Sequence, residues 1–190
     1  MDNFENLATI SNIFKEMPVK DIEAEARAIA HQNQLTKPPG ALGILEELAI
    51  FLASWQKKTM PSLRAVQALV FAGNHGMCYQ GVNPFPQDVT KQMVENFKAG
   101  GAAINQLCEV NGADLKVVPI ALETPTADFT KKEAMSESEL CEAMEIGARS
   151  VNLDSDLILL GEMGIGNSTI SSALAASVFG GSVGRWVGAG

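Results

Sequence analysis

Basic residues are scarce in this sequence, and their scarcity argues against one class of function. The chain of 190 residues has 14 lysines and arginines against 22 aspartates and glutamates, a formal net charge of −8 at pH 7. A nucleic-acid-binding surface needs clustered cations to neutralise phosphates. We therefore expect no nucleic acid among the partners of this protein.

Long hydrophobic runs are absent as well. A membrane span needs about 20 consecutive apolar residues, and no stretch of the sequence approaches that length. The N-terminal stretch MDNFENLATISNIF is polar and acidic, which is unlike a secretory signal. The sequence therefore predicts a cytoplasmic protein without a membrane partner.

Cysteine is rare and follows no pattern. Cys78, Cys108 and Cys141 are widely spaced, odd in number and unlike any metal-ligand spacing. Structural disulfides belong mainly to oxidising compartments and to small secreted domains. We expect three reduced thiols, each buried for structural reasons, and no metal site.

Short apolar runs separated by helical patterns predict the fold class. Residues 64–72 (RAVQALVFA) are almost continuously apolar, as expected for a strand covered on both faces. Residues 115–120 (LKVVPI) predict a second strand that ends at Pro119 or lies at an edge, and residues 157–160 (LILL) predict a third, buried strand. The alternation predicts an α/β fold, with a parallel, doubly wound, Rossmann-like sheet and flanking helices.

The strongest functional signal is the stretch LILLGEMGIGNST at residues 157–169. Glycines at 161, 164 and 166 follow the apolar run, and residues 167–169 open an alanine-rich helical segment. A strand, a glycine turn and a helix start bring unpaired backbone N–H groups and the positive end of a helix dipole together. Such a place suits an anion, most often a phosphate, and Ser168 or Thr169 could cap the helix.

The same turn has simpler interpretations. A glycine-rich turn also forms where the chain only reverses tightly, and the spacing G-x-x-G-x-G is neither the dinucleotide fingerprint nor a P-loop. A carboxylate repels phosphate, so Glu162 needs another task, such as accepting a proton or holding a polar substrate group. Alternatively, Glu162 is a solvated loop acid.

The predicted topology places three connections on one rim. Ligands of parallel sheets collect at the carboxyl ends of the strands, where residues 73–86, the connection after Ile120 and the glycine turn would meet. His75 could be a general base, a ligand contact or a donor that stabilises its loop. Phe85 and Met93 are either core residues or walls of a flat apolar pocket for an aromatic ligand.

Four stretches together resemble one enzyme family. They are residues 35–48 (LTKPPGALGILEEL), 70–76 (VFAGNHG), 81–105 (GVNPFPQDVTKQMVENFKAGGAAIN) and 161–169 (GEMGIGNST). In this order they resemble nicotinate-nucleotide–dimethylbenzimidazole phosphoribosyltransferase, which assembles the lower nucleotide loop of cobalamin. The resemblance implies transfer of the phosphoribosyl group of nicotinate mononucleotide to 5,6-dimethylbenzimidazole. The implied products are α-ribazole 5′-phosphate, inverted at the anomeric carbon, and nicotinate.

The resemblance also implies roles for individual residues. Glu162 matches an acid that supports activity, and Phe85 and Met93 match positions around the benzimidazole, where we also place His75. The nucleotide- and phosphate-binding residues that it implies are Gly161, Met163, Gly164, Ile165, Gly166, Asn167, Ser168, Thr169, Gly188 and Gly190. It implies a homodimer and no cofactor.

Two features depart from the family pattern. Asn74 stands where many members have an aspartate, and members are almost twice as long, with their general-base glutamate in a glycine-rich segment beyond Gly190. We therefore expect residues 1–60 to form the N-terminal part of a small helical domain. Residues 61–190 would then form an α/β nucleotide-binding domain that is truncated at its C-terminal end and lacks the principal base.

Two other functions remain open at this stage. The chain could be a non-catalytic module that binds a nucleotide or a benzimidazole. It could also be a nicotinamide-dependent oxidoreductase, although the glycine spacing is wrong and no acid for the ribose stands about twenty residues beyond the turn.

Overall fold

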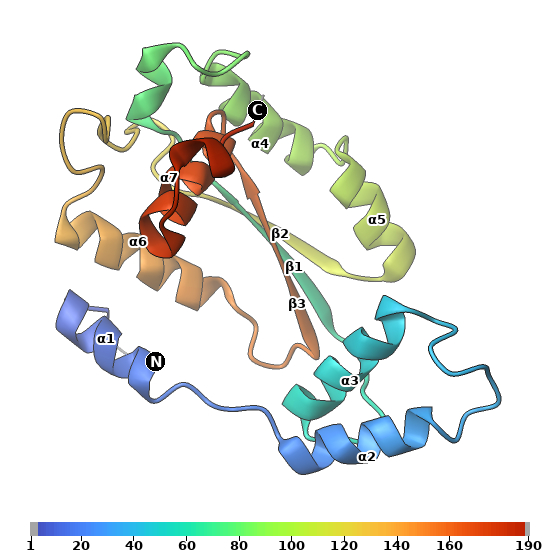
Figure 1. Ribbon diagram of the computed structural model, residues 1–190. Coiled ribbons are helices and arrows are strands. Elements are labelled where there is room, and N and C mark those ends of the chain that lie inside the picture. Colours follow the sequence, from blue (N-terminus) through green and yellow to red (C-terminus); the bar gives the residue numbers. More distant parts are fainter. Residues whose placement is uncertain (1–3, 189–190) are drawn as a thin grey trace.

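The computed structural model describes residues 4–188 and is organised around a parallel three-stranded sheet (Figure 1). The strands are β1 (Val66–Ala72), β2 (Asp114–Pro119) and β3 (Leu157–Met163), in the spatial order β2-β1-β3. Both pairings with β1 are parallel. The predicted α/β fold with a parallel sheet is confirmed.

The central strand β1 forms the core of the sheet. Ala68, Leu69 and Val70 are buried, and Val70 pairs with Val117 of β2 and with Gly161 of β3. A strand with neighbours on both sides and helices above and below has no polar face, which explains its continuous apolar sequence. In β2, Pro119 is the final residue, as predicted.

The third strand differs from the prediction in length and in burial. The ladder with β1 continues through Gly161, Glu162 and Met163, so β3 is three residues longer than the predicted strand 157–160. The side chains of Leu159 and Leu160 are 44% and 76% exposed, so the prediction of a buried strand is wrong. Within residues 4–188, β3 has a strand neighbour on one side only, which leaves part of its surface uncovered.

Helices cover both faces of the sheet. Helices α4 (Asp88–Lys98) and α5 (Ala103–Asn111) connect β1 to β2, α6 (Glu137–Ser150) connects β2 to β3, and α7 (Asn167–Phe179) follows β3. The two connections cross the sheet in opposite directions, and right-handed crossovers then place their helices on opposite faces. Figure 1 shows α4 and α5 on one side and α6 and α7 on the other, which confirms the doubly wound arrangement.

The start of α6 has a capping box. The Ser136 hydroxyl accepts the backbone N–H of Glu139, and the Glu139 carboxylate accepts the N–H of Ser136. Two short 3₁₀ helices, η1 (Gly76–Gln80) and η2 (Val183–Arg185), lie in the loop after β1 and after α7. Among the described residues, no helix has the length and apolarity to cross a membrane.

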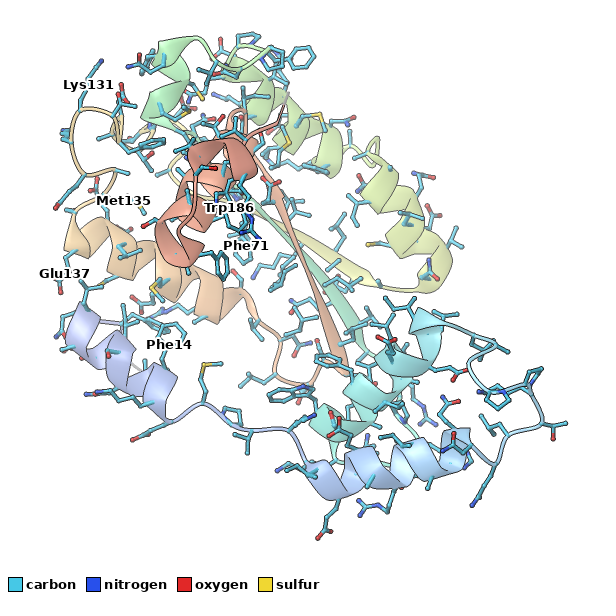
Figure 2. The ribbon with its side chains drawn as sticks, viewed as in Figure 1. Phe14, Phe71, Lys131, Met135, Glu137 and Trp186 are labelled. Atoms are coloured by element: carbon cyan, nitrogen blue, oxygen red, sulfur yellow. The ribbon has the colours of Figure 1, made fainter. Side chains whose placement is uncertain are left out.

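The N-terminal helices lie in two places. Helices α2 (Ile22–Gln32) and α3 (Ile44–Gln56) pack together, with Asp21 N–H donating to the Ser54 carbonyl at 3.0 Å. Helix α1 (Leu7–Lys15) instead lies beside the start of α6, where the N–H of Leu7 donates to the Glu137 carboxylate at 2.9 Å (Figure 2). The division of the chain at residue 60 stays a prediction.

Candidate functional site

The carboxyl ends of the three strands share one rim, as the sequence predicts. Strand β1 ends at Ala72, β2 at Pro119 and β3 at Met163, and all three run in the same direction. The connection from β1 leads to β2 on one side, while β3 lies on the other side of β1. The crevice between β1 and β3 is therefore a topological switch point, where open parallel sheets bind ligands.

A cavity of about 260 Å³, here called the rim cavity, opens at this switch point. It is built from the end of β1 and the loop after it, the end of β3, the residue after β2, and the first turns of α7. Three of the predicted site residues meet in it. Its lining residues are Phe71, Ala72, Gly73, His75, Ile120, Glu162, Asn167, Ile170 and Ser171.

Glu162 is the acidic group of the rim cavity. It lies within β3 and pairs in register with Phe71 of β1, so the prediction that Glu162 and Gly161 belong to the turn is wrong. The reason is that the β1 ladder extends to Ala72 and carries β3 with it. In the described part of the chain, the Glu162 carboxylate has no hydrogen-bond or ion-pair partner, and its side chain is exposed. A carboxylate in this state is free to act on a bound molecule.

The turn itself consists of residues 164–166, and both of its glycines are required by geometry. A Cβ on Gly164 would lie 2.5 Å from the backbone oxygen of Gly73, so the turn approaches the β1 loop too closely for a side chain. Gly166 has φ of 90°, in the left-handed region, and a Cβ there would lie 2.8 Å from Sγ of Cys78. The glycines thus allow close approach between the turn and the loop after β1.

Helix α7 begins without a side-chain cap. Its N-cap is Gly166, so the prediction that Ser168 or Thr169 caps the helix is wrong. The helix begins at Asn167, which places both hydroxyl residues inside its first turn. Within the described residues, the backbone N–H groups of Gly166 and Ser168 make no hydrogen bond. Free N–H groups at a helix N-terminus form an anion-binding site.

Both polar backbone groups of Ile165, in the middle of the turn, are hydrogen-bonded to side chains. The N–H donates to Oγ1 of Thr90 at 3.1 Å, and the carbonyl accepts from Sγ of Cys78 at 3.0 Å. Thr90 belongs to α4 and Cys78 to η1, so both partners come from segments far away in the sequence. The conformation of the turn therefore depends on the loop after β1 and the helix that follows.

His75 joins the loop after β1 to the start of α7. Its ring Nε2 lies 2.5 Å from Oδ1 of Asn167, and its backbone carbonyl accepts the side-chain amide of Gln87 at 2.7 Å. Of the three roles considered for His75, the structure therefore shows a hydrogen bond that stabilises its loop. The ring also lines the rim cavity, and its contact with a ligand stays a prediction.

Asn74 has a structural task that an aspartate could not perform. Its Nδ2 donates to the carbonyl of Leu122 at 2.9 Å, and its own carbonyl accepts the N–H of Thr126 at 3.1 Å. The N–H of Gly76 in turn donates to the Thr126 carbonyl at 2.8 Å. These bonds hold the loop after β1 against the loop after β2. An ionised aspartate at position 74 has no proton to donate to Leu122.

A glycine-rich turn and free N–H groups at a switch point suit an anionic group, and the carboxylate beside them suits a different, uncharged part of a ligand. Comparison with known proteins identifies the family. A family model described as "Phosphoribosyltransferase" matches residues 17–190, which is most of the chain. The chain belongs to this phosphoribosyltransferase family. The recognition made from the four sequence motifs is confirmed.

Named relatives give the family a more specific description. The chain is 53% identical over 185 residues to the nicotinate-nucleotide–dimethylbenzimidazole phosphoribosyltransferase of Rhodobacter capsulatus, covering 97% of this chain and 55% of the relative. It is 51% identical over 187 residues to the enzyme of the same name from Roseobacter denitrificans, covering 98% of this chain and 56% of that protein. The chain thus spans about half the length of the curated relatives that it matches.

Solved structures agree with the fold. The crystal structure of the enzyme of this name from Thermus thermophilus superimposes with a TM-score of 0.76 at 36% identity, over 84% of this chain and 54% of that one. A second crystal structure from the same organism gives a TM-score of 0.78 at 37% identity, over 87% of this chain and 56% of that one. The doubly wound sheet described here is therefore the family fold.

Other predicted nucleotide residues of this phosphoribosyltransferase-family chain lie around a second cavity. A groove of about 360 Å³ along α7, here called the α7 groove, is lined by Ser168, Thr169 and Gly188, with Phe129 from the loop after β2. The predicted phosphate-binding residues therefore lie on two sides of the first turn of α7. Gly190 lies outside the described residues.

Of the residues predicted to form the base pocket, only His75 lines the rim cavity. Phe85 is 60% exposed and Met93 is half-buried, and neither lines the rim cavity. Both belong to the segment that runs from η1 into α4. Their assignment to the benzimidazole stays a prediction.

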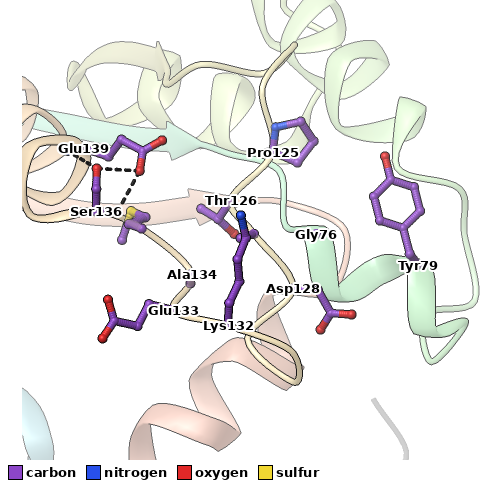
Figure 3. A pocket seen from close by; sticks show the side chains of 12 residues that line it. Gly76, Tyr79, Pro125, Thr126, Asp128, Lys132, Glu133, Ala134, Ser136 and Glu139 are labelled. Atoms are coloured by element: carbon purple, nitrogen blue, oxygen red, sulfur yellow. Dashed lines mark hydrogen bonds between the residues drawn. The ribbon is translucent and has the colours of Figure 1, made fainter.

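A third and larger cavity, of about 730 Å³, adjoins the rim and is shown in Figure 3. Gly76 and Thr126 form one wall, and the loop that carries Asp128 and Lys132 forms another. The Asp128 carboxylate accepts hydrogen bonds from the hydroxyl and N–H of Thr130 and from the amide of Gln80. These donors hold the pKa of Asp128 well below its ordinary value, so it stays ionised and fixes the loop.

Sequence reasoning missed three residues of this site, namely Asn74 as a donor, Cys78 and Thr90. The sequence predicts a simply buried Cys78, whereas the residue is half-buried and bonded to the turn. Thr90 lies in a helical pattern in which a threonine carries no particular signal. The partners of Cys78 and Thr90 lie 87 and 75 residues away, and no local pattern reports such contacts.

Proposed function

We propose that this chain binds nicotinate mononucleotide in an enzyme that transfers its phosphoribosyl group to 5,6-dimethylbenzimidazole, in the assembly of the nucleotide loop of cobalamin. The single observation that carries the proposal is the arrangement at the β1–β3 crevice. There the free N–H groups of Gly166 and Ser168 lie at the start of α7, and the unpartnered carboxylate of Glu162 lines the adjoining rim cavity. The names of the relatives support the choice of substrates.

We place the phosphate of the mononucleotide at the start of α7. Its charge suits the free N–H groups and the positive end of the α7 dipole, each of which favours an anion. Glu162 would repel a phosphate, so in our proposal the phosphate lies at the helix start and the ribose extends toward Glu162. This separation resolves the conflict between an acid and an anion in one site.

The reaction then needs charge stabilisation at the ribose. The bond between C1′ and the nicotinate nitrogen breaks while a benzimidazole nitrogen attacks C1′ from the opposite face, which inverts that carbon. Positive charge develops on the ribose ring, and a carboxylate already in place stabilises it without reorganisation. Holding both reactants in the correct geometry supplies a further part of the rate.

Proton transfer completes the reaction. The attacking benzimidazole loses the proton on its other nitrogen, so the reaction requires a base. We assign Glu162 the role of a supporting carboxylate, and the family resemblance assigns the principal base to a glutamate outside these 190 residues. A homodimer and a cytoplasmic location also belong to the proposal. The homodimer rests on the resemblance, and the location rests on the composition of the sequence.

Titration calorimetry and product analysis test this function. They use the intact protein, by which we mean the complete natural polypeptide that contains these 190 residues. We expect binding of nicotinate mononucleotide that is tighter than binding of NAD, and formation of α-ribazole 5′-phosphate when 5,6-dimethylbenzimidazole is added. Binding without turnover would support a non-catalytic module instead. Tighter binding of NAD would favour a nicotinamide-dependent enzyme, and the absence of any affinity for the mononucleotide would refute the proposal.

A further inference from the structure

Thr90 is a fully buried polar residue whose hydroxyl contacts the turn at residues 164–166. Its exposed fraction is 0%, and it lies in the first turn of α4, on the segment after β1. Its Oγ1 accepts the N–H of Ile165 at 3.1 Å. A buried hydroxyl is stabilising only when it is hydrogen-bonded, so this contact fixes both groups.

The carbonyl of the same turn residue is held from η1. Sγ of Cys78 donates to the Ile165 carbonyl at 3.0 Å. Burial raises the pKa of the Cys78 thiol, so the group stays protonated at neutral pH and remains a donor. Ile165 is therefore fixed at its N–H by Thr90 and at its carbonyl by Cys78.

Peptide geometry transmits this restraint to the groups that face a ligand. The Ile165 carbonyl and the Gly166 N–H belong to one planar, trans peptide unit, so they point in opposite directions. With the carbonyl bonded to Cys78, the Gly166 N–H points away from Cys78, and in the described residues it has no other partner.

The preceding peptide unit is fixed in the same way. It joins the Gly164 carbonyl to the Ile165 N–H, which Thr90 holds. The Gly164 carbonyl accepts the N–H of Asn167 at 3.1 Å, so this unit also ties the turn to the start of α7.

We propose that Thr90 and Cys78 are positioning residues for the mononucleotide phosphate, because their bonds to Ile165 set the direction of the Gly166 N–H at the start of α7. The inference rests on the proposed function, since it assumes that a phosphate binds at this turn. Neither side chain touches the phosphate. Each acts through the backbone of the turn.

The test compares Thr90→Val with Thr90→Ser in the intact protein. Valine has the shape of threonine but no acceptor, whereas serine retains the acceptor. We expect Thr90→Val to weaken binding of nicotinate mononucleotide and of inorganic phosphate about ten-fold in calorimetry, the usual effect of one lost hydrogen bond to a buried group. Thr90→Ser is expected to restore affinity to within about two-fold of the parent.

Steady-state kinetics separate positioning from a loss of stability. A phosphate contact acts equally on substrate and transition state, so the KM for the mononucleotide should rise while kcat and the KM for dimethylbenzimidazole stay the same. The matched control is Ser54→Ala, which removes another buried hydroxyl bond, to the Phe51 carbonyl at 2.7 Å, on α3 away from the rim. The control should lower Tm and leave every KM unchanged.

A second pair of variants covers the case in which Thr90→Val does not fold. Cys78 is only half-buried, so Cys78→Ala should fold, and it should weaken mononucleotide binding while Cys78→Ser, which keeps a donor, does so less. If Thr90→Val and Cys78→Ala bind the mononucleotide like the parent protein, the positioning role is refuted and the proposed function stands. If the parent protein itself has no affinity for the mononucleotide, both the function and this inference fail.

Discussion

Nε2 of His75 and Oδ1 of Asn167 lie 2.5 Å apart, and this contact connects the loop after β1 to the first turn of α7, where both residues line the rim cavity. An amide oxygen can only accept, so Nε2 of the imidazole carries the proton. The bond spans 92 residues of sequence and joins the two segments on either side of the topological switch point. It fixes the distance between the two walls that a ligand would contact.

A double-mutant cycle tests the strength of this contact. We expect His75→Ala and Asn167→Ala to be non-additive, with a coupling free energy of about 1 kcal/mol in the free energy of unfolding, as for other hydrogen-bonded neighbours. Chemical denaturation of the parent, the two single variants and the double variant measures it. Additive effects within about 0.3 kcal/mol would show that the two side chains do not stabilise each other.

Replacement of the rim carboxylate tests its catalytic role. In Glu162→Gln the shape is kept and the charge is lost, so kcat should fall roughly 100-fold while the KM for the mononucleotide changes little. Because Glu162 is exposed and has no partner among the described residues, the Tm of this variant should match that of the parent. Product formation in steady-state assays measures the effect, and an unchanged kcat would make Glu162 a solvated acid.

A methyl group in the turn should disturb both stability and binding. Gly164→Ala places a Cβ against the backbone oxygen of Gly73, which cannot move without shifting the loop after β1, so we expect a loss of about 1–3 kcal/mol in stability. Gly184→Ala is the matched control, since a Cβ there meets no atom within 4 Å. Denaturation curves and mononucleotide titrations on both variants are the measurement. Equal behaviour of the two variants would contradict the close approach that we describe.

Acid should weaken the hydrogen bonds that join Asp156, the residue before β3, to the segment before β1. Asp156 accepts the N–H of Arg64 and of Ala65 and the hydroxyl of Ser62, and the backbone donors hold its pKa below the ordinary value of 3.8. A lowered folded-state pKa contributes stability above the unfolded pKa, and that contribution is lost as the pH falls through the folded pKa. We therefore expect the stability of the parent to decline from about pH 4 downward.

The variant Asp156→Asn tests this interpretation. It should be less stable than the parent at pH 7, and the difference between the two should shrink below about pH 4, because the parent then loses its own charge. Urea denaturation at a series of pH values measures the difference. A difference that stays constant down to about pH 2 would show that the charge of Asp156 makes no contribution.

Much of the fold follows from local patterns in the sequence. The continuous apolar run of β1 depends on neighbouring residues only, and the structure confirms the strand that it predicts. The capping box of Ser136 and Glu139 likewise joins residues only three positions apart. The end of β3 was misjudged because Gly161 and Glu162 have low strand propensity, whereas pairing with Val70 and Phe71 of the adjacent strand overrides that preference. The cap of α7 was misjudged for a related reason, since Gly166 already occupies the left-handed N-cap position.

The candidate site was predicted less completely than the fold. Glu162, His75 and Asn167 meet in one cavity because parallel strands bring their carboxyl ends to one rim, which the sequence pattern predicts. The roles of Cys78 and Thr90 depend on the packing of η1 and α4 against the turn. A cysteine or a threonine in the sequence does not by itself predict a hydrogen bond to a distant turn. The periodicity of apolar residues predicts helices and strands, but it does not predict hydrogen bonds between residues that are far apart in the sequence.

The two bonds to Ile165 also limit whether the glycine turn can be grafted onto another protein with its conformation unchanged. Residues 157–169 grafted onto another strand–helix unit would keep the glycines and the helix start, but would lose the thiol and the hydroxyl that lie beneath them. The peptide group between Ile165 and Gly166 would then be free to rotate. The conformation of this turn thus depends partly on α4, a helix of the crossover from β1 to β2. If the proposed phosphate site is correct, a transplant that omits this helix should not bind phosphate.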